Sequence, residues 1–217
     1  MSRMRAASTL ERPHTQPAIN AYRRRRIIEG ALRSVATRGL AATTIKTIAE
    51  EAGVSRGLLA HYYGSKDELL AAAYRHLCEV IAEQIATAAR ASDRGTVGRL
   101  NAIVEVVFSP PVFDPVNLRV FVAFWHEALA NPGLRAIKHE LYAGYRTTTA
   151  RLFRKEAEER GLSLDADAAA VGLLALLDGL WQELALDQST CTPEQARAIG
   201  LRAIAGTFAL AAAEGGT

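Results

Sequence analysis

Three short segments of the sequence carry residue types that catalyse hydrolysis in other proteins. Residues 53–57 read Gly-Val-Ser-Arg-Gly and fit the GxSxG spacing around a nucleophilic serine. Residues 126–127 and 139–140 read His-Glu and begin the HExxH spacing of a zinc protease, but neither segment has the second histidine. The two cysteines, Cys78 and Cys191, have no CxxC or Cys/His spacing around them, as expected of free thiols in a reducing compartment. We therefore expect no metal site and, since P-loop and GxGxxG patterns are also absent, no cofactor.

The residues around Ser55 argue against a hydrolase. A serine nucleophile elbow needs a strand before the serine and a helix after it. Here apolar residues at helical spacing lead up to Gly53, and Ser55 stands where it can cap the next helix. We therefore expect a protein that is not an enzyme, with a serine hydrolase as the alternative.

Helical periodicity extends through the sequence and predicts an all-α protein of about nine helices. Proline and glycine fall between the periodic segments, and no segment alternates polar and apolar residues as a strand does. The expected helices span residues 21–38, 44–52, 55–63, 65–90, 96–108, 115–130, 133–160, 165–187 and 193–214. Residues 1–20 contain two prolines and no apolar period, which predicts a flexible basic arm. Its Arg3, Arg5 and Arg12 either contact a DNA minor groove or form an idle tail.

Charge is distributed unevenly along the chain. Residues 1–66 contain 12 Lys and Arg against 4 Asp and Glu, a net charge of +8. The remaining residues contain 14 Lys and Arg against 19 Asp and Glu, a net charge of −5. This asymmetry indicates an N-terminal module that binds a polyanion, the alternative being a basic face that only keeps the protein soluble.

The expected helices over 44–52 and 55–63 are joined by the short turn 53–55 and followed by a long third helix, which is typical of a helix-turn-helix. Hydrogen-bond donors stand at the starts of these helices, where DNA phosphates would lie. They include Thr43, Thr44, Arg56 and Lys66. We therefore predict that the module binds double-stranded DNA.

Residues 42–70, ATTIKTIAEEAGVSRGLLAHYYGSKDELL, resemble the DNA-binding segment of the TetR/AcrR repressors. The resemblance implies that Thr44, Tyr62 and Lys66 contact phosphates and that Arg56, Gly57 and His61 face base edges. The Arg56 guanidinium can donate to guanine O6 and N7 at the same time. Such a contact favours guanine over a wrong base by about 1–3 kcal/mol. The predicted DNA-binding residues are Thr43, Thr44, Ser55, Arg56, Gly57, His61, Tyr62 and Lys66.

The sequence departs from that family at two positions. Tyr63 stands where many relatives have Phe, and its hydroxyl needs a partner if the ring is buried. Ala60 is small where relatives often have a larger contacting residue, which would leave base readout more dependent on Arg56.

The predicted domains are the arm over residues 1–20, a DNA-binding domain over 21–81 and a helical effector-binding and dimerisation domain over 82–217. Residues 168–186 are apolar nearly all round the expected helix, and the last helix carries the small residues Ala203 and Gly206. We expect these two helices to form a homodimer interface, with a monomer that buries them internally as the alternative.

A second resemblance concerns the BetI-like branch, whose members respond to choline. It rests on Ala-Phe-Trp at 123–125 and on Leu-Leu-Asp-Gly-Leu-Trp at 176–181. Aromatic faces with one carboxylate suit a quaternary ammonium ion through cation–π attraction, although an aromatic stripe at helical spacing also suits a plain core. The predicted effector-binding residues are Phe121, Phe124, Trp125, Tyr142, Tyr145, Asp178 and Trp181.

Together these features predict a homodimeric repressor that a small-molecule effector releases from operator DNA. We expect it in the cytoplasm and not in a membrane, because the N-terminus lacks an apolar segment and the longest apolar run, 168–177, is about half a membrane span. The alternative from another class is a helical interaction module that does not bind DNA.

Overall fold

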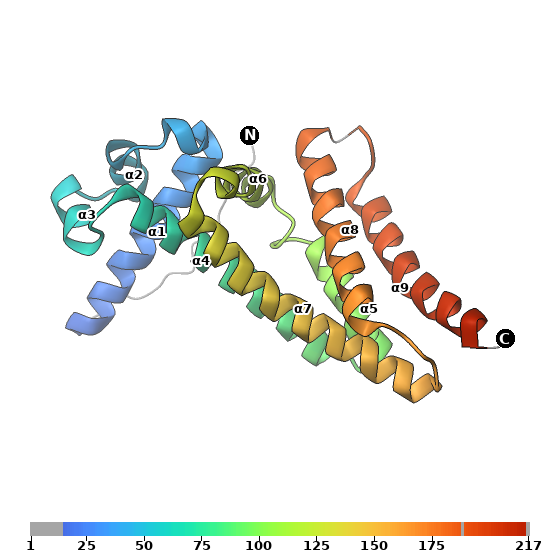
Figure 1. The fold of residues 1–217 in the computed structure, drawn as a ribbon. Helices are drawn as coiled ribbons and strands as arrows, with labels where there is room; N and C mark the ends of the chain where they lie inside the picture. The colour runs from blue at the N-terminus through green and yellow to red at the C-terminus, as the bar shows by residue number, and fades with distance from the viewer. Residues whose placement is uncertain (1–14, 188, 216–217) are drawn as a thin grey trace. The chain divides into compact units, whose positions relative to one another are not determined.

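The computed structural model describes residues 15–187 and 189–215, and helices account for most of these residues. This part contains nine helices and no strand, so the all-α prediction is confirmed. The arm residues Arg3, Arg5 and Arg12 lie outside the described residues. In chain order (Figure 1) the helices are α1 (Gln16–Ala42), α2 (Ile45–Ala52), α3 (Arg56–Tyr62), α4 (Lys66–Ala91), α5 (Gly95–Val107), α6 (Pro115–Ala130), α7 (Pro132–Arg160), α8 (Ala166–Leu186) and α9 (Pro193–Gly215).

The chain divides into two compact units between Ala73 and Tyr74, within α4. Unit 1 contains α1, α2, α3 and the start of α4, and unit 2 contains the rest of α4 and α5 to α9. The core of unit 1 includes Ile27 and Ala31 of α1, Ile48 of α2, Leu59 of α3 and Leu69 of α4. Each helix of unit 1 thus buries an apolar stripe against the others.

The first helix differs from its prediction at its start. α1 begins at Gln16, so residues 16–20 of the expected flexible arm are helical. The proline that suggested an arm, Pro17, lies in the first turn, where the missing N–H of proline costs nothing. Gly39 interrupts the helical dihedrals with φ of 77°, at the position where the sequence predicts that the helix ends.

Two arginines of α1 stabilise the end of α2. The guanidinium of Arg26 donates to the carbonyl of Ala52 at 2.7 Å, and that of Arg33 donates to the carbonyl of Glu51 at 2.7 Å. These carbonyls belong to the last turn of α2, where no helical N–H is available. Gly30 lies between the two arginines, and the close approach of α2 to it leaves no room for a side chain.

The turn between α2 and α3 follows from its local sequence. Gly53 ends α2 in the left-handed region, with φ of 63°, and its N–H donates to the carbonyl of Glu50 at 3.2 Å. Ser55 then caps α3, because its hydroxyl oxygen accepts a hydrogen bond from the Leu58 N–H at 3.1 Å. Two helices joined by so short a turn form the expected helix-turn-helix.

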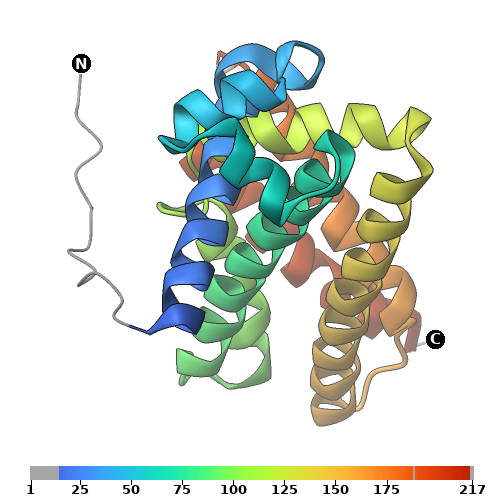
Figure 2. The ribbon, with the colours of Figure 1, turned by 90° about the vertical axis from the view of Figure 1, so that its left-hand side faces the viewer.

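In unit 2, α7 packs against α5, α6 and α8, and α9 packs against α5 and α8. Figure 2 shows α6 meeting α7 at a sharp corner, where Asn131 ends α6 and its side chain caps α7. The aromatic core of this unit includes Phe153 and Phe208, whose ring centroids are 5.6 Å apart. Helices α5 to α8, together with α4, line the cavity described below.

The close contact between α1 and α2 predicts the effect of one added methyl group. In Gly30→Ala, the new Cβ would lie 2.6 Å from the Cβ and 2.7 Å from the backbone nitrogen of Ala52, so a helix must move. We expect the free energy of unfolding to fall by about 1–3 kcal/mol in thermal or urea unfolding. Gly57→Ala is the matched control, because its nearest atom would lie 4.0 Å away and the folded state should tolerate it. Equal stability of the two variants would contradict the close packing.

Candidate functional site

The surface of α3 presents the residues predicted to read DNA. Arg56, Gly57 and His61 are exposed, and the Arg56 guanidinium has no hydrogen-bond or ion-pair partner within 15–187 and 189–215. A Cβ at Gly57 would meet only the Ser55 hydroxyl, at 4.0 Å, so another molecule can approach the backbone closely there. The unpaired charge and the open backbone lie on adjacent residues of the same helix turn.

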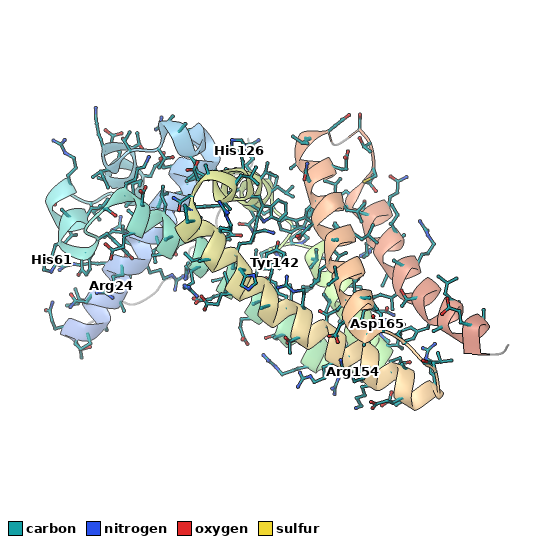
Figure 3. The ribbon with its side chains drawn as sticks, in the orientation of Figure 1. Arg24, His61, His126, Tyr142, Arg154 and Asp165 are labelled. Atoms are coloured by element: carbon teal, nitrogen blue, oxygen red, sulfur yellow. The ribbon has the colours of Figure 1, made fainter. Side chains whose placement is uncertain are left out.

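Tyr62 connects α3 to the basic start of α1. Its hydroxyl donates to the Asn20 side-chain oxygen at 3.0 Å, and the Arg24 guanidinium lies 5.6 Å from the centre of its ring. His61 packs its ring edge against Tyr62 at 5.3 Å, and Figure 3 labels both His61 and Arg24. Arg24 was not among the predicted site residues. The run of four arginines at 23–26 was a signal for it, but sequence alone could not separate Arg24 from the structural Arg26.

Thr44 and Lys66 meet at the start of α2. Thr44 is exposed and caps α2 in a reciprocal capping box with Thr47. The Lys66 ammonium donates to the carbonyl of Thr43 at 3.2 Å, which holds its charge next to the positive end of the α2 dipole. This arrangement favours an anion.

Thr43 does not belong to this surface, which corrects its prediction. Its side chain is fully buried, and its hydroxyl donates to the carbonyl of Gly39 at 2.7 Å. The hydroxyl of Ser34 donates to it in turn at 3.4 Å. Ser55 is exposed, but its hydroxyl oxygen is engaged in the helix cap.

Sequence reasoning missed Lys46 as a candidate. Its side chain is exposed on α2, and together with Arg56 it lines a shallow surface hollow that also includes Glu50 and Val54. Lys46 lies in the second position of α2, and only the three-dimensional arrangement shows that it neighbours Arg56. The helix-turn-helix thus presents two free cations, Lys46 and Arg56, among the residues described.

Unit 2 contains a cavity of about 470 Å³ between α4, α5, α6, α7 and α8. Six of the seven predicted effector-binding residues line it. They are Phe121, Trp125, Tyr142, Tyr145, Asp178 and Trp181. A volume of this size lies within the range of small-molecule sites.

Phe124 is the exception, and its prediction is corrected. Its side chain is fully buried and stacks on the ring of Tyr74 from α4, with ring centroids 4.7 Å apart. Phe121, three residues earlier on the same helix, faces the cavity instead. Phe124 is therefore a core residue of unit 2.

Asp178 is a half-buried carboxylate that lines the cavity. The hydroxyl of Tyr142, which is labelled in Figure 3, donates to Asp178 Oδ1 at 3.1 Å. Burial raises the pKa of the Asp178 carboxyl to about 6, while the Tyr142 hydrogen bond and the Lys138 ammonium oppose that rise. At neutral pH the cavity therefore contains a poorly solvated negative charge.

Aromatic rings line the same cavity as this carboxylate. The Trp181 ring meets that of Phe121 edge-on at 5.4 Å, and its N–H donates to the carbonyl of Val107 at 3.2 Å. The indole N–H of Trp125 is buried and has no hydrogen-bond acceptor within the described residues. A cation between such faces is attracted by the rings as well as by the carboxylate.

The remaining titratable groups do not suggest metal or thiol chemistry. Within the part of the chain that the structure describes, no three side chains of His, Cys, Asp or Glu lie close enough to hold a metal ion. Cys78 and Cys191 are free, and burial raises the pKa of the Cys78 thiol to about 12, which leaves it protonated.

Comparison with known proteins identifies both units. Residues 27–73 match the bacterial regulatory proteins of the tetR family, and residues 96–209 match the C-terminal domain of BetI-type transcriptional repressors. The HTH-type transcriptional regulator BetI of Burkholderia thailandensis is 34% identical over 167 residues, which are 76% of this chain and 82% of that regulator. The chain belongs to the TetR family of bacterial transcriptional regulators, with a BetI-type C-terminal domain.

Solved structures agree with this assignment. A protein from Pseudomonas aeruginosa PAO1, described as a transcriptional regulator, is 34% identical with a TM-score of 0.79, covering 86% of this chain and 90% of its own. Another described regulator, from Saccharomonospora viridis, was solved in complex with choline. It is 27% identical with a TM-score of 0.74, covering 83% of this chain and 94% of its own.

The family assignment settles two questions raised by the sequence. TetR-family regulators bind operator DNA and small-molecule effectors and are not enzymes, so residues 53–57 belong to a helix-turn-helix and not to a hydrolase site. By length and composition alone α8 and α9 could cross a membrane. This family consists of soluble bacterial regulators, so these two helices do not indicate a membrane protein.

The buried carboxylate predicts how stability depends on pH. Its pKa is raised by folding, so the wild-type protein should lose stability as the pH rises from about 4 to about 6. Asp178→Asn keeps an acceptor for Tyr142 and removes this charge, so we expect it to be more stable by about 2 kcal/mol at pH 7.5 and equally stable near pH 3.5. Urea unfolding across this pH range measures the difference. Glu183→Gln, which removes an exposed carboxylate of the same helix, should leave the pH profile unchanged, and the same profile for all three proteins would contradict burial of the charge.

Proposed function

We propose that the protein is a cytoplasmic homodimeric repressor that a small choline-like cation releases from its operator. One observation carries this proposal: unit 2 holds an aromatic-lined cavity with the carboxylate of Asp178 in it, in a chain whose other unit contains a helix-turn-helix. The choline complex of the Saccharomonospora viridis protein supports the choice of ligand.

In the proposed DNA complex, α3 enters the major groove. Arg56 holds a guanine edge, Gly57 lets the helix backbone approach, and His61 faces the bases further along the helix. Thr44, Tyr62 and Lys66 contact phosphates on either side of the groove, and Lys46 and Arg24 add positive charge next to them. Thr43 has no role in this complex because its side chain is buried.

The proposed dimer uses the exposed sides of α8 and α9. Small residues recur at helical spacing on α8 as Ala168, Gly172, Ala175 and Gly179, all exposed, and a Cβ at either glycine would meet no atom within 4 Å. Larger apolar side chains flank them, with Val171 52% exposed and Leu186 69% exposed. Leu173 and Leu177 of α8 are buried within unit 2 and do not belong to this exposed face.

A cation would relieve the desolvated charge of Asp178. Its positive charge would sit near the carboxylate and against the faces of Trp125 and Trp181, and it would replace hydration that Asp178 loses on folding. The ligand weakens DNA binding only to the extent that it binds the DNA-free conformation more tightly. α4 belongs to both units and is the proposed lever between them.

Replacing the proposed base-reading side chain tests the DNA interface. Arg56→Ala should weaken binding to the operator by about 1–3 kcal/mol while binding to a scrambled duplex changes less, because the arginine reads sequence. Fluorescence anisotropy at one fixed salt concentration, with the DNA upstream of the protein's own gene, measures both affinities. Arg99→Ala, an exposed arginine of α5 without a partner within the described residues, is the matched control. Equal losses on both duplexes, or none, would refute the assigned role of Arg56.

The proposed dimer interface predicts the effect of a single large side chain on α8. Ala175→Arg places a charge in the middle of the exposed apolar face, and we expect it to weaken self-association by at least about tenfold because a buried unpaired charge is costly. Sedimentation velocity at several protein concentrations measures this. Ala136→Arg, on an exposed position of α7, should sediment as the wild type does. A wild-type monomer, or an Ala175→Arg protein that dimerises normally, would overturn the interface.

A further inference from the structure

The cavity of unit 2 has a polar end. Asp178 and Trp181 lie one turn apart on α8, and Tyr142 of α7 bonds the carboxylate. The Tyr145 hydroxyl donates to the carbonyl of Cys78 at 3.0 Å, which places Cys78 of α4 at the same end. The cavity's charge and most of its hydrogen-bonding groups therefore gather here.

A second carboxylate at this end, that of Glu140, is already neutralised. Both of its oxygens accept hydrogen bonds from the Arg75 guanidinium, at 2.9 and 2.8 Å. The pKa of the Glu140 carboxyl is lowered by this hydrogen bond. Asp178 accepts only the Tyr142 hydroxyl within the described residues, and the nearby Lys138 ammonium lies over the Tyr142 ring at 4.2 Å. The charge that still lacks a close cationic partner is that of Asp178.

The cavity then continues along the helices into apolar surroundings. α4 lines it from Ile81 as far as Ala89, about 16 Å along the helix axis from Cys78. α7 lines it from Tyr142 to Leu152, a rise of about 15 Å. At this far end the lining side chains are uncharged. They are Ala82, Ile85, Ala86, Ala89, Ile103, Thr148, Thr149, Leu152 and Leu174.

A small cation such as choline would occupy the polar end and leave the apolar end empty or filled with water. Apolar walls bind water poorly, so filling them with hydrocarbon adds to affinity. The cavity volume of about 470 Å³ is that of a site for a drug-sized ligand.

We infer that the cavity binds an amphipathic monocation, with a quaternary ammonium head at Asp178 and a linear apolar tail that runs between α4 and α7 toward Ala89 and Leu152. This inference rests on the proposed function for the identity of the site and adds the class of ligand. A neutral apolar ligand would leave the Asp178 charge without a partner, and a cation without a tail would leave the far end unused.

Isothermal titration calorimetry with a series of alkyltrimethylammonium ions tests the inference without any DNA. Choline and the hexyl, octyl and decyl ions are the probes, each kept below its micelle-forming concentration, with octanol as the neutral control. We expect affinity to rise by roughly fourfold for each added methylene until the tail fills the cavity. Asp178→Asn should weaken binding of every cation by about tenfold or more and leave octanol unaffected.

A variant that shortens the cavity distinguishes the contribution of the tail to affinity from that of the head group. Ala86→Phe should remove the gain from the longer tails and leave choline affinity unchanged, since Ala86 lines the apolar end. Thr87→Phe, at an exposed position next to it on α4, should behave as the wild type does. The chain-length series on the wild-type protein stands by itself if Ala86→Phe does not fold.

The outcomes distinguish failure of the inference from failure of the proposed function. Equal affinity for choline and for the decyl ion would overturn the tail and leave a choline-like effector in place. Binding of octanol with no binding of any cation would overturn both. A length-dependent series that binds tightly but does not release the operator in anisotropy would support the ligand class and refute the proposed repressor mechanism.

Discussion

The rest of the effector site depends on one carboxylate that is partly removed from water. Asp178 lies within the long apolar part of α8, and the Tyr142 hydroxyl is its one hydrogen-bond donor within the described residues. Burying a charge is unfavourable unless a partner compensates it, so the folded protein is less stable than it would be without this group. Such a cost is offset when a cationic ligand binds. The aromatic rings of α6 and α8 and the apolar end of the cavity then determine which cation fits.

The helix-turn-helix shows a different use of charge. Unit 1 is rich in arginine, but Arg26 and Arg33 are committed to the last carbonyls of α2. Arg56 and Lys46 have no partner within the described residues and remain available to a polyanion. The net charge of this part of the sequence therefore has two roles, one that builds the motif and one that is exposed on it. The net charge of +8 for residues 1–66 does not distinguish these two roles.

Local signals made most of the fold predictable. Glycines at 39 and 53, prolines at or between helix starts and serine or threonine caps act over a few residues, so one sequence suffices to place them. The predicted start of the first helix was wrong, because Pro17 suits either a flexible arm or the first turn of a helix. Packing against residues far away in the chain decides between the two. Thr43 and Thr44 both suit a cap, and only the fold shows that Thr43 points inward to Gly39. Phe121 and Phe124 lie on the same side of α6, but Phe124 stacks on Tyr74 of α4 and therefore belongs to the core. The site residues missed or misassigned were those whose role depends on partners far away in the chain.

The most direct test of the coupling between the two units is the operator affinity with and without a saturating cation, in wild-type protein and in Asp178→Asn. Anisotropy of labelled operator at fixed salt gives all four dissociation constants. We expect the octyltrimethylammonium ion to weaken wild-type binding by at least about tenfold, a coupling in the range usual for allosteric proteins, and to leave Asp178→Asn bound. Without cation, the two proteins should bind the operator equally well. Release that is the same in both proteins, or no release of the wild type at saturation, would contradict a cavity that controls DNA binding through the charge of Asp178.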